Sequence, residues 1–86
     1  MHETHLLKNI FQYLDKEEKS SAKKIRKIYI SLSEFGGISS QHFRAHYREE
    51  SAGTRWENLK VELHKVPYGP ELEITKLDFV NTDTHG

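Results

Sequence analysis

The chain has 86 residues, 13 basic and 13 acidic side chains and no cysteine, so its formal net charge is zero. The neutral charge lacks the basic surplus that nucleic-acid binding usually needs, and the missing thiols exclude disulfides, thiolate metal sites and cysteine nucleophiles. No apolar run approaches the ~18 residues of a membrane span, and the first 20 residues are amphipathic rather than signal-like, so we expect a cytoplasmic protein without a membrane partner.

Apolar periodicity predicts two helices and three strands in the order α-β-α-β-β. The helices, in which apolar residues recur at helical spacing, are expected over residues 4–19 and 40–51. The strands, in which apolar and polar residues alternate, are expected over residues 25–33, 59–66 and 71–80. In the last strand the apolar side changes near Thr75 and Lys76, which predicts a bulge. Residues 81–86 contain no apolar side chain and are expected to form a disordered tail.

These elements predict an α+β fold, a two-layer α/β sandwich that forms one domain over residues 1–80. The strand–helix–strand unit is expected to form a right-handed parallel crossover. Residues 67–70, Pro-Tyr-Gly-Pro, are dense in turn formers, so the last two strands are expected to form an antiparallel hairpin. The result is a three-stranded mixed sheet with both helices on one face.

Six histidines are a high count for a chain of this length, and the sharpest arrangement lies at the start. His2 stands between Met1 and Glu3, which places an imidazole beside the α-amine and the first backbone amides. These nitrogens can close chelate rings around Ni(II) or Cu(II), which accept planar nitrogen coordination. The alternative interpretation is an exposed terminal histidine that binds nothing.

Other histidines offer weaker metal sites. His5 is three residues from His2 and shares a metal with it if the first helix begins at the terminus. His42 and His46 are four residues apart on the second helix, so their rings can meet on one face, a spacing found in zinc sites. The alternative is an exposed pair on a polar helix face. Because the sequence has no phosphate loop, nucleophile elbow or close carboxylate pair in a cleft, we expect no enzyme activity.

The chain resembles the HypA/HybF family of nickel metallochaperones, which help to insert nickel into hydrogenase and, in some organisms, urease. The resemblance covers the chain to about Phe79. It rests on Met1-His2-Glu3 before an amphipathic helix, on the strand residues 28–34, and on residues 52–54, Ala-Gly-Thr, before a strand. It implies that the Met1 α-amine, the His2 imidazole and backbone nitrogen, and the Glu3 amide hold Ni(II). A metalloenzyme precursor or a maturation GTPase is the implied partner, and a homodimer is also considered.

Family members carry a zinc-binding domain with two Cys-x-x-Cys pairs between the last two strands, where this chain has only residues 67–70. We therefore expect no structural zinc. The expected function is a zinc-free, metallochaperone-like protein that binds nickel and assists its delivery to a hydrogenase-type metalloenzyme. One alternative is a non-catalytic protein-interaction module of the same fold that has lost metal transfer. Another is sequestration of nickel or copper by His42 and His46.

Overall fold

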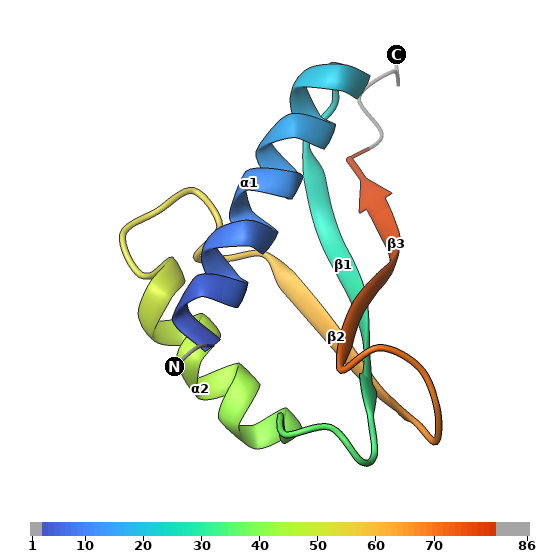
Figure 1. Cartoon of the computed structure of the whole chain (residues 1–86). Helices are drawn as coiled ribbons and strands as arrows, with labels where there is room; N and C mark the ends of the chain where they lie inside the picture. Colours follow the sequence, from blue (N-terminus) through green and yellow to red (C-terminus); the bar gives the residue numbers. More distant parts are fainter. Residues whose placement is uncertain (1–2, 81–86) are drawn as a thin grey trace.

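The computed structural model describes residues 3–80, which form two α-helices and a three-stranded sheet (Figure 1). The elements are α1, Glu3–Ser21; β1, Ile25–Ser33; α2, Ser40–Ser51; β2, Lys60–Val66; and β3, Leu72–Phe79. Their order and the mixed sheet confirm the predicted α+β class. Met1, His2 and the tail expected at residues 81–86 lie outside the described residues. Within residues 3–80, no helix is long and apolar enough to cross a membrane.

Local sequence signals account for the bounds of α2. The side chain of Ser39 accepts a hydrogen bond from the backbone N–H of His42 at 3.1 Å, which caps the first turn. Gly53, just beyond the last turn, has a φ of 79°. This left-handed conformation ends a helix and favours glycine, which accounts for the end of α2 at Ser51.

The strand β1 is the centre of the sheet, whose order is β2-β1-β3. It pairs in parallel with β2 and antiparallel with β3. The parallel pairing of the strand–helix–strand unit is therefore confirmed. The predicted hairpin between the last two strands is wrong, because β2 and β3 lie on opposite sides of β1 and do not pair with each other.

The connection between β2 and β3 explains this difference. The amide of Glu34 donates to the carbonyl of Val66 at 2.8 Å, and the amide of Ser33 donates to the carbonyl of Glu71 at 3.3 Å. Residues 67–71 therefore pass across the end of β1. They have to span two strand spacings of about 4.8 Å each, which is well within the reach of five residues. A mostly buried central strand that pairs with a neighbour on each side buries more surface than an isolated hairpin does.

The predicted bulge in β3 is confirmed. The register between β1 and β3 shifts between Tyr29, which faces Lys76, and Ile30, which faces Ile74, so Thr75 is the extra residue. Its hydroxyl donates to the carbonyl of Tyr29 at 3.3 Å. The extra residue lets the apolar side chains on both sides of the bulge face the same side of the sheet.

One hydrophobic core lies between the sheet and the two helices, which cover the same face (Figure 1). Apolar side chains from α1, β1, α2 and the segments on either side of α2 form this core and are at most 7% exposed. The core residues are Leu7, Ile10, Leu14, Ile25, Ile28, Ile30, Leu32, Ile38, Phe43, Tyr47 and Trp56. Grooves on either side place α1 beside β3 and α2 beside β2. The opposite face of the sheet carries polar side chains.

Candidate metal centre

The residues with the strongest metal-binding pattern lie where α1 begins. Met1 and His2 are outside the described residues. Glu3 is the first residue of α1 and His5 lies in its first turn, with both side chains outside the description. The first four N–H groups of an α-helix have no acceptor within the helix. The amide of Glu3 therefore has no intrahelical hydrogen bond to lose if its nitrogen binds a metal.

Packing fixes the N-terminal half of α1 against the rest of the molecule. Leu7 is fully buried and Ile10 is 4% exposed. The ring of Phe11 contacts the ring of Tyr47 on α2, with centroids 5.6 Å apart, and stacks on Trp56 at 6.5 Å. The predicted ligands therefore precede or begin a helix that is held by the core.

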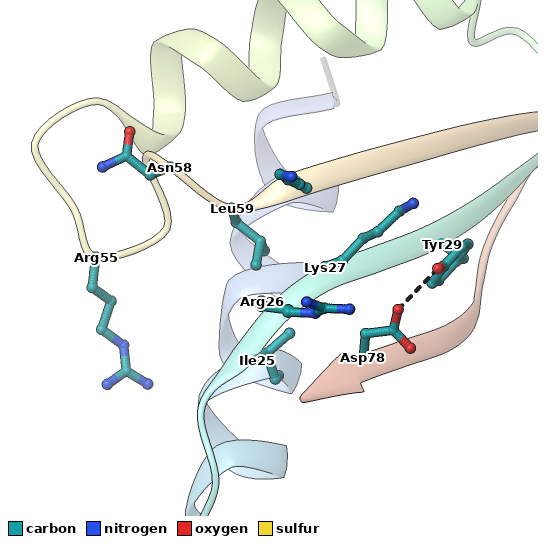
Figure 2. Close-up of a pocket in the computed structure, with 9 residues that line it drawn as sticks. Ile25, Arg26, Lys27, Tyr29, Arg55, Asn58, Leu59 and Asp78 are labelled. Carbon is teal, nitrogen blue, oxygen red and sulfur yellow. Dashed lines mark hydrogen bonds between the residues drawn. The ribbon is translucent and has the colours of Figure 1, made fainter. Parts of the chain in front are cut away.

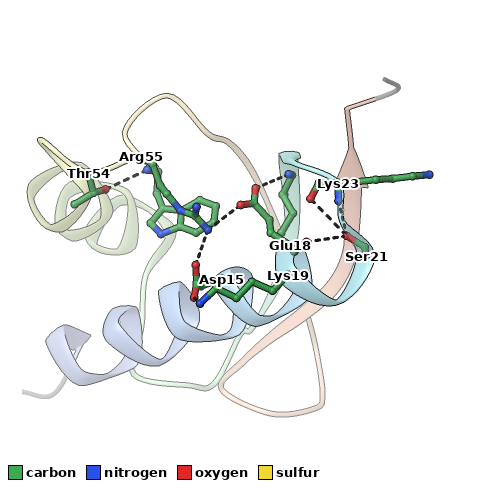
Figure 3. A network of polar contacts seen from close by, with 9 residues as sticks. Asp15, Glu18, Lys19, Ser21, Lys23, Thr54 and Arg55 are labelled. Carbon is green, nitrogen blue, oxygen red and sulfur yellow. Dashed lines mark hydrogen bonds and ion pairs between the residues drawn. The ribbon is translucent and has the colours of Figure 1, made fainter. Parts of the chain in front are cut away.

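A polar network fixes the C-terminal half of the same helix (Figure 3). The guanidinium of Arg55, in the segment before β2, lies 2.6 Å from the Asp15 carboxylate and 2.8 Å from that of Glu18. The other carboxylate oxygen of Glu18 accepts a hydrogen bond from the amide of Ile25 at 2.7 Å. Arg55 also lies 4.4 Å from the ring centroid of Trp56. Sequence interpretation missed Arg55, which ties the loop before β2 to α1.

The histidine pair of α2 is brought together. The ring centroids of His42 and His46 are 5.2 Å apart and the ring planes are tilted by 52°. His42 is exposed and His46 is half-buried. The two imidazoles therefore meet on one side of the helix, as their spacing predicts.

His64 lies on the open face of the sheet, away from the helices. Its Nε2 is 2.7 Å from one carboxylate oxygen of Glu62, and the Nζ of Lys27 is 2.7 Å from the other. Hydrogen bonds from Lys27 and then from His64 lower the pKa of Glu62, and the bond to Glu62 raises the pKa of Lys27. Within residues 3–80, no group of three or more histidine, aspartate or glutamate side chains is arranged to hold a metal.

A cavity of about 480 Å³ opens beside β1 (Figure 2). The hydroxyl of Tyr29 donates to the carboxylate of Asp78 at 2.9 Å in its wall. Four lining side chains are cationic: Arg26, Lys27, Arg55 and Lys60. Charged ammonium and guanidinium groups offer no lone pair to a metal, so this cavity does not suit a cation such as nickel.

Comparison with known proteins connects the chain to a family. The family model described as HypA, hydrogenase/urease nickel incorporation metallochaperone, matches residues 1–78. The match takes in Met1, His2 and Glu3 and extends from α1 into β3. A search of curated proteins finds no match.

Proposed function

The chain belongs to the HypA family of hydrogenase/urease nickel-incorporation metallochaperones, and from this premise we propose that it binds nickel at its first three residues and assists nickel delivery to a hydrogenase-type metalloenzyme. The observation that carries the proposal is the family match over residues 1–78, which includes Met1-His2-Glu3. Nickel is the cargo of a carrier, so the proposed role is not catalytic.

In the proposed site, four nitrogens surround the ion. The free α-amine of Met1, the backbone nitrogen and imidazole of His2, and the amide nitrogen of Glu3 supply them, with the Glu3 carboxylate as an additional ligand. Two features of α1 support this arrangement. The amide of Glu3 lacks an intrahelical acceptor, and the buried Leu7 holds the helix that begins there.

The proposed site depends on pH and does not distinguish metals by affinity alone. Protons have to leave the amine, the imidazole and the ligating amides before the metal binds, so nickel affinity falls as the pH falls. Copper competes strongly, because divalent copper binds nitrogen ligands more tightly than nickel does. Supply of nickel and the geometry of the site then determine which ion is carried.

We also propose that the chain works without structural zinc. It contains no cysteine, and residues 67–71 join β2 to β3 directly. The proposed partner, met in the cytoplasm, is a metalloenzyme precursor or a maturation GTPase, and the chain is proposed to dimerise in solution. Without zinc thiolates, recognition of that partner has to use the α/β surface itself.

Visible absorption spectroscopy of the nickel-loaded protein tests the proposed site. Planar coordination by four nitrogens gives a characteristic band in the visible spectrum of Ni(II). We expect the band in the natural sequence with a free Met1 amine and in His64→Ala, which removes an exposed histidine of β2. His2→Ala should lose the band while its circular dichroism stays unchanged. An undiminished band in His2→Ala would overturn the proposed ligand set.

A further inference from the structure

A bulge in β1 places two consecutive cations in the wall of one cavity. The register between β1 and β3 shifts between Ile25 and Lys27, so Arg26 is the extra residue. Successive side chains of a regular strand point to opposite faces, and regular alternation would direct Arg26 toward the core, as it directs Ile28. Instead, Arg26 is exposed and lines the cavity beside β1 together with Lys27 (Figure 2). Bulges that redirect a side chain in this way are frequent next to active sites.

The register of β2 adds a third cation. Lys60, the first residue of β2, is the partner of Lys27 in the parallel β1–β2 ladder and lines the same cavity. Like charges at facing positions of neighbouring strands are destabilising. A bound anion would relieve this repulsion. The cavity volume of about 480 Å³ lies within the range of small-molecule sites.

Two of the four cations in the cavity wall already have carboxylate partners. The Nζ of Lys27 lies 2.7 Å from the carboxylate of Glu62. The guanidinium of Arg55 lies 2.6 Å from the carboxylate of Asp15 and 2.8 Å from that of Glu18. The charges of Lys27 and Arg55 are therefore compensated within the protein.

Arg26 and Lys60 supply the uncompensated charge. Within residues 3–80, neither side chain has a carboxylate within ion-pair distance. The carboxylate in the cavity wall, Asp78, accepts a hydrogen bond from the Tyr29 hydroxyl at 2.9 Å and lies 3.8 Å from the Nζ of Lys76. The described part of the chain therefore leaves two positive charges of the wall without a counter-ion.

We propose that Arg26 and Lys60 bind a dianionic phosphate group, either free inorganic phosphate or the monoester of a small molecule. A phosphate monoester carries a charge of about −1.5 to −2 at pH 7, which matches the two uncompensated cations. The planar fork of arginine binds two phosphate oxygens, and lysine adds a point charge. The site uses neither the first three residues nor nickel, so it is independent of the proposed nickel function.

NMR titration of the nickel-free protein tests the site, with inorganic phosphate and methyl phosphate as separate probes. A constant ionic strength of about 0.15 M keeps general screening the same throughout. Arg26→Gln and Lys60→Gln each remove one of the two cations. Lys65→Gln is the matched control, because it removes an exposed lysine of β2 that does not line the cavity. Circular dichroism checks that each variant is folded.

We expect inorganic phosphate to shift the resonances of Arg26 and Lys60 in the natural sequence. Arg26→Gln and Lys60→Gln should each bind it at least about fivefold more weakly, whereas Lys65→Gln should change the affinity by less than about twofold. Binding of methyl phosphate as well supports a monoester site, and binding of inorganic phosphate alone supports a site for the free ion.

Dimethyl phosphate tests the requirement for two charges. It is a monoanion, so it should bind more weakly than inorganic phosphate does. Equal binding of dimethyl phosphate would overturn the assignment to a dianion. An equal loss of affinity in Lys65→Gln, or phosphate binding that leaves the resonances of Arg26 and Lys60 unshifted, would overturn the site itself, as would no binding of either phosphate probe.

Discussion

The ring of Phe11 on α1 meets the ring of Tyr47 on α2 edge to face, with centroids 5.6 Å apart and planes at 71°. This contact joins the helix that begins with the proposed nickel ligands to the helix that carries the histidine pair. The helix that carries the proposed nickel ligands is therefore held in the helical layer of the fold. The ion pairs of Lys27, Glu62 and His64 lie on the other face of the sheet.

Replacing Phe11 with leucine tests this interhelical contact. Leucine keeps an apolar side chain but removes the aromatic contacts to Tyr47 and Trp56. We expect the free energy of unfolding to fall by about 1 kcal/mol, as measured by urea denaturation. Tyr13→Leu, at a 42% exposed position of the same helix, should change it by less than about 0.5 kcal/mol. Equal losses in both variants would contradict a specific role for the contact.

The hydroxyl of Tyr47 should make stability depend on alkaline pH. It donates to the carbonyl of Trp56 at 2.8 Å, and burial raises the pKa of Tyr47 far above its ordinary value of 10.0. The folded state therefore retains a proton that the unfolded state loses near pH 10.0. The resulting stabilisation is complete below that pH and is lost as the pH rises toward the folded-state pKa.

Tyr47→Phe should cost about 1 kcal/mol at neutral pH, because the carbonyl of Trp56 loses its donor. Above about pH 10 the variant cannot ionise at this position, so the difference from the natural protein should narrow. Urea denaturation at several pH values measures this difference. A gap that stays constant through the alkaline range would contradict the assigned role of burial.

Glu62 should contribute to stability only while it is ionised. Hydrogen bonds from Lys27 and His64 lower its pKa below the ordinary value of 4.5. The stabilisation is therefore present above pH 4.5 and is lost as the pH falls through the lowered pKa. Glu62→Gln should destabilise the protein at neutral pH and have little effect in strong acid. Glu73→Gln, at an exposed position of β3, is the control and should destabilise the protein less at neutral pH.

Gly53 is expected to be required for its backbone conformation alone. Its φ is 79°, and a Cβ atom at this position would meet no atom within 4 Å. Gly53→Ala should therefore cost about 1 kcal/mol without any steric clash. Gly53→Asn should cost less, because asparagine tolerates the left-handed region. Thermal unfolding of both variants checks this order, and a neutral Gly53→Ala would contradict it.

Local patterns were sufficient to predict the elements of the fold. Alternation of apolar and polar residues over residues 28–33 indicates β1, and the change of apolar side at Thr75 gives the bulge. The order of the strands was not predictable in the same way. A connection of four residues suits a hairpin between the last two strands. In the observed order, the mostly buried β1 lies between the partly buried β2 and β3.

The side-chain contacts of the candidate sites differ in how far local sequence patterns predict them. The meeting of the His42 and His46 rings follows from helical spacing. The ion pair of Arg55 with Asp15 joins residues 40 positions apart and depends on how the loop before β2 packs on α1, which no local pattern encodes. The nickel ligands at Met1, His2 and Glu3 stay a prediction from sequence and family.

Calorimetric titration of Ni(II) tests the central proposal most directly. The comparison is between protein whose Met1 carries a free α-amine and protein with one extra residue before Met1, which moves His2 out of its chelate position. We expect one nickel ion to bind the first form and binding to be lost in the second. Equal binding of nickel by both forms would contradict a site built on Met1, His2 and Glu3.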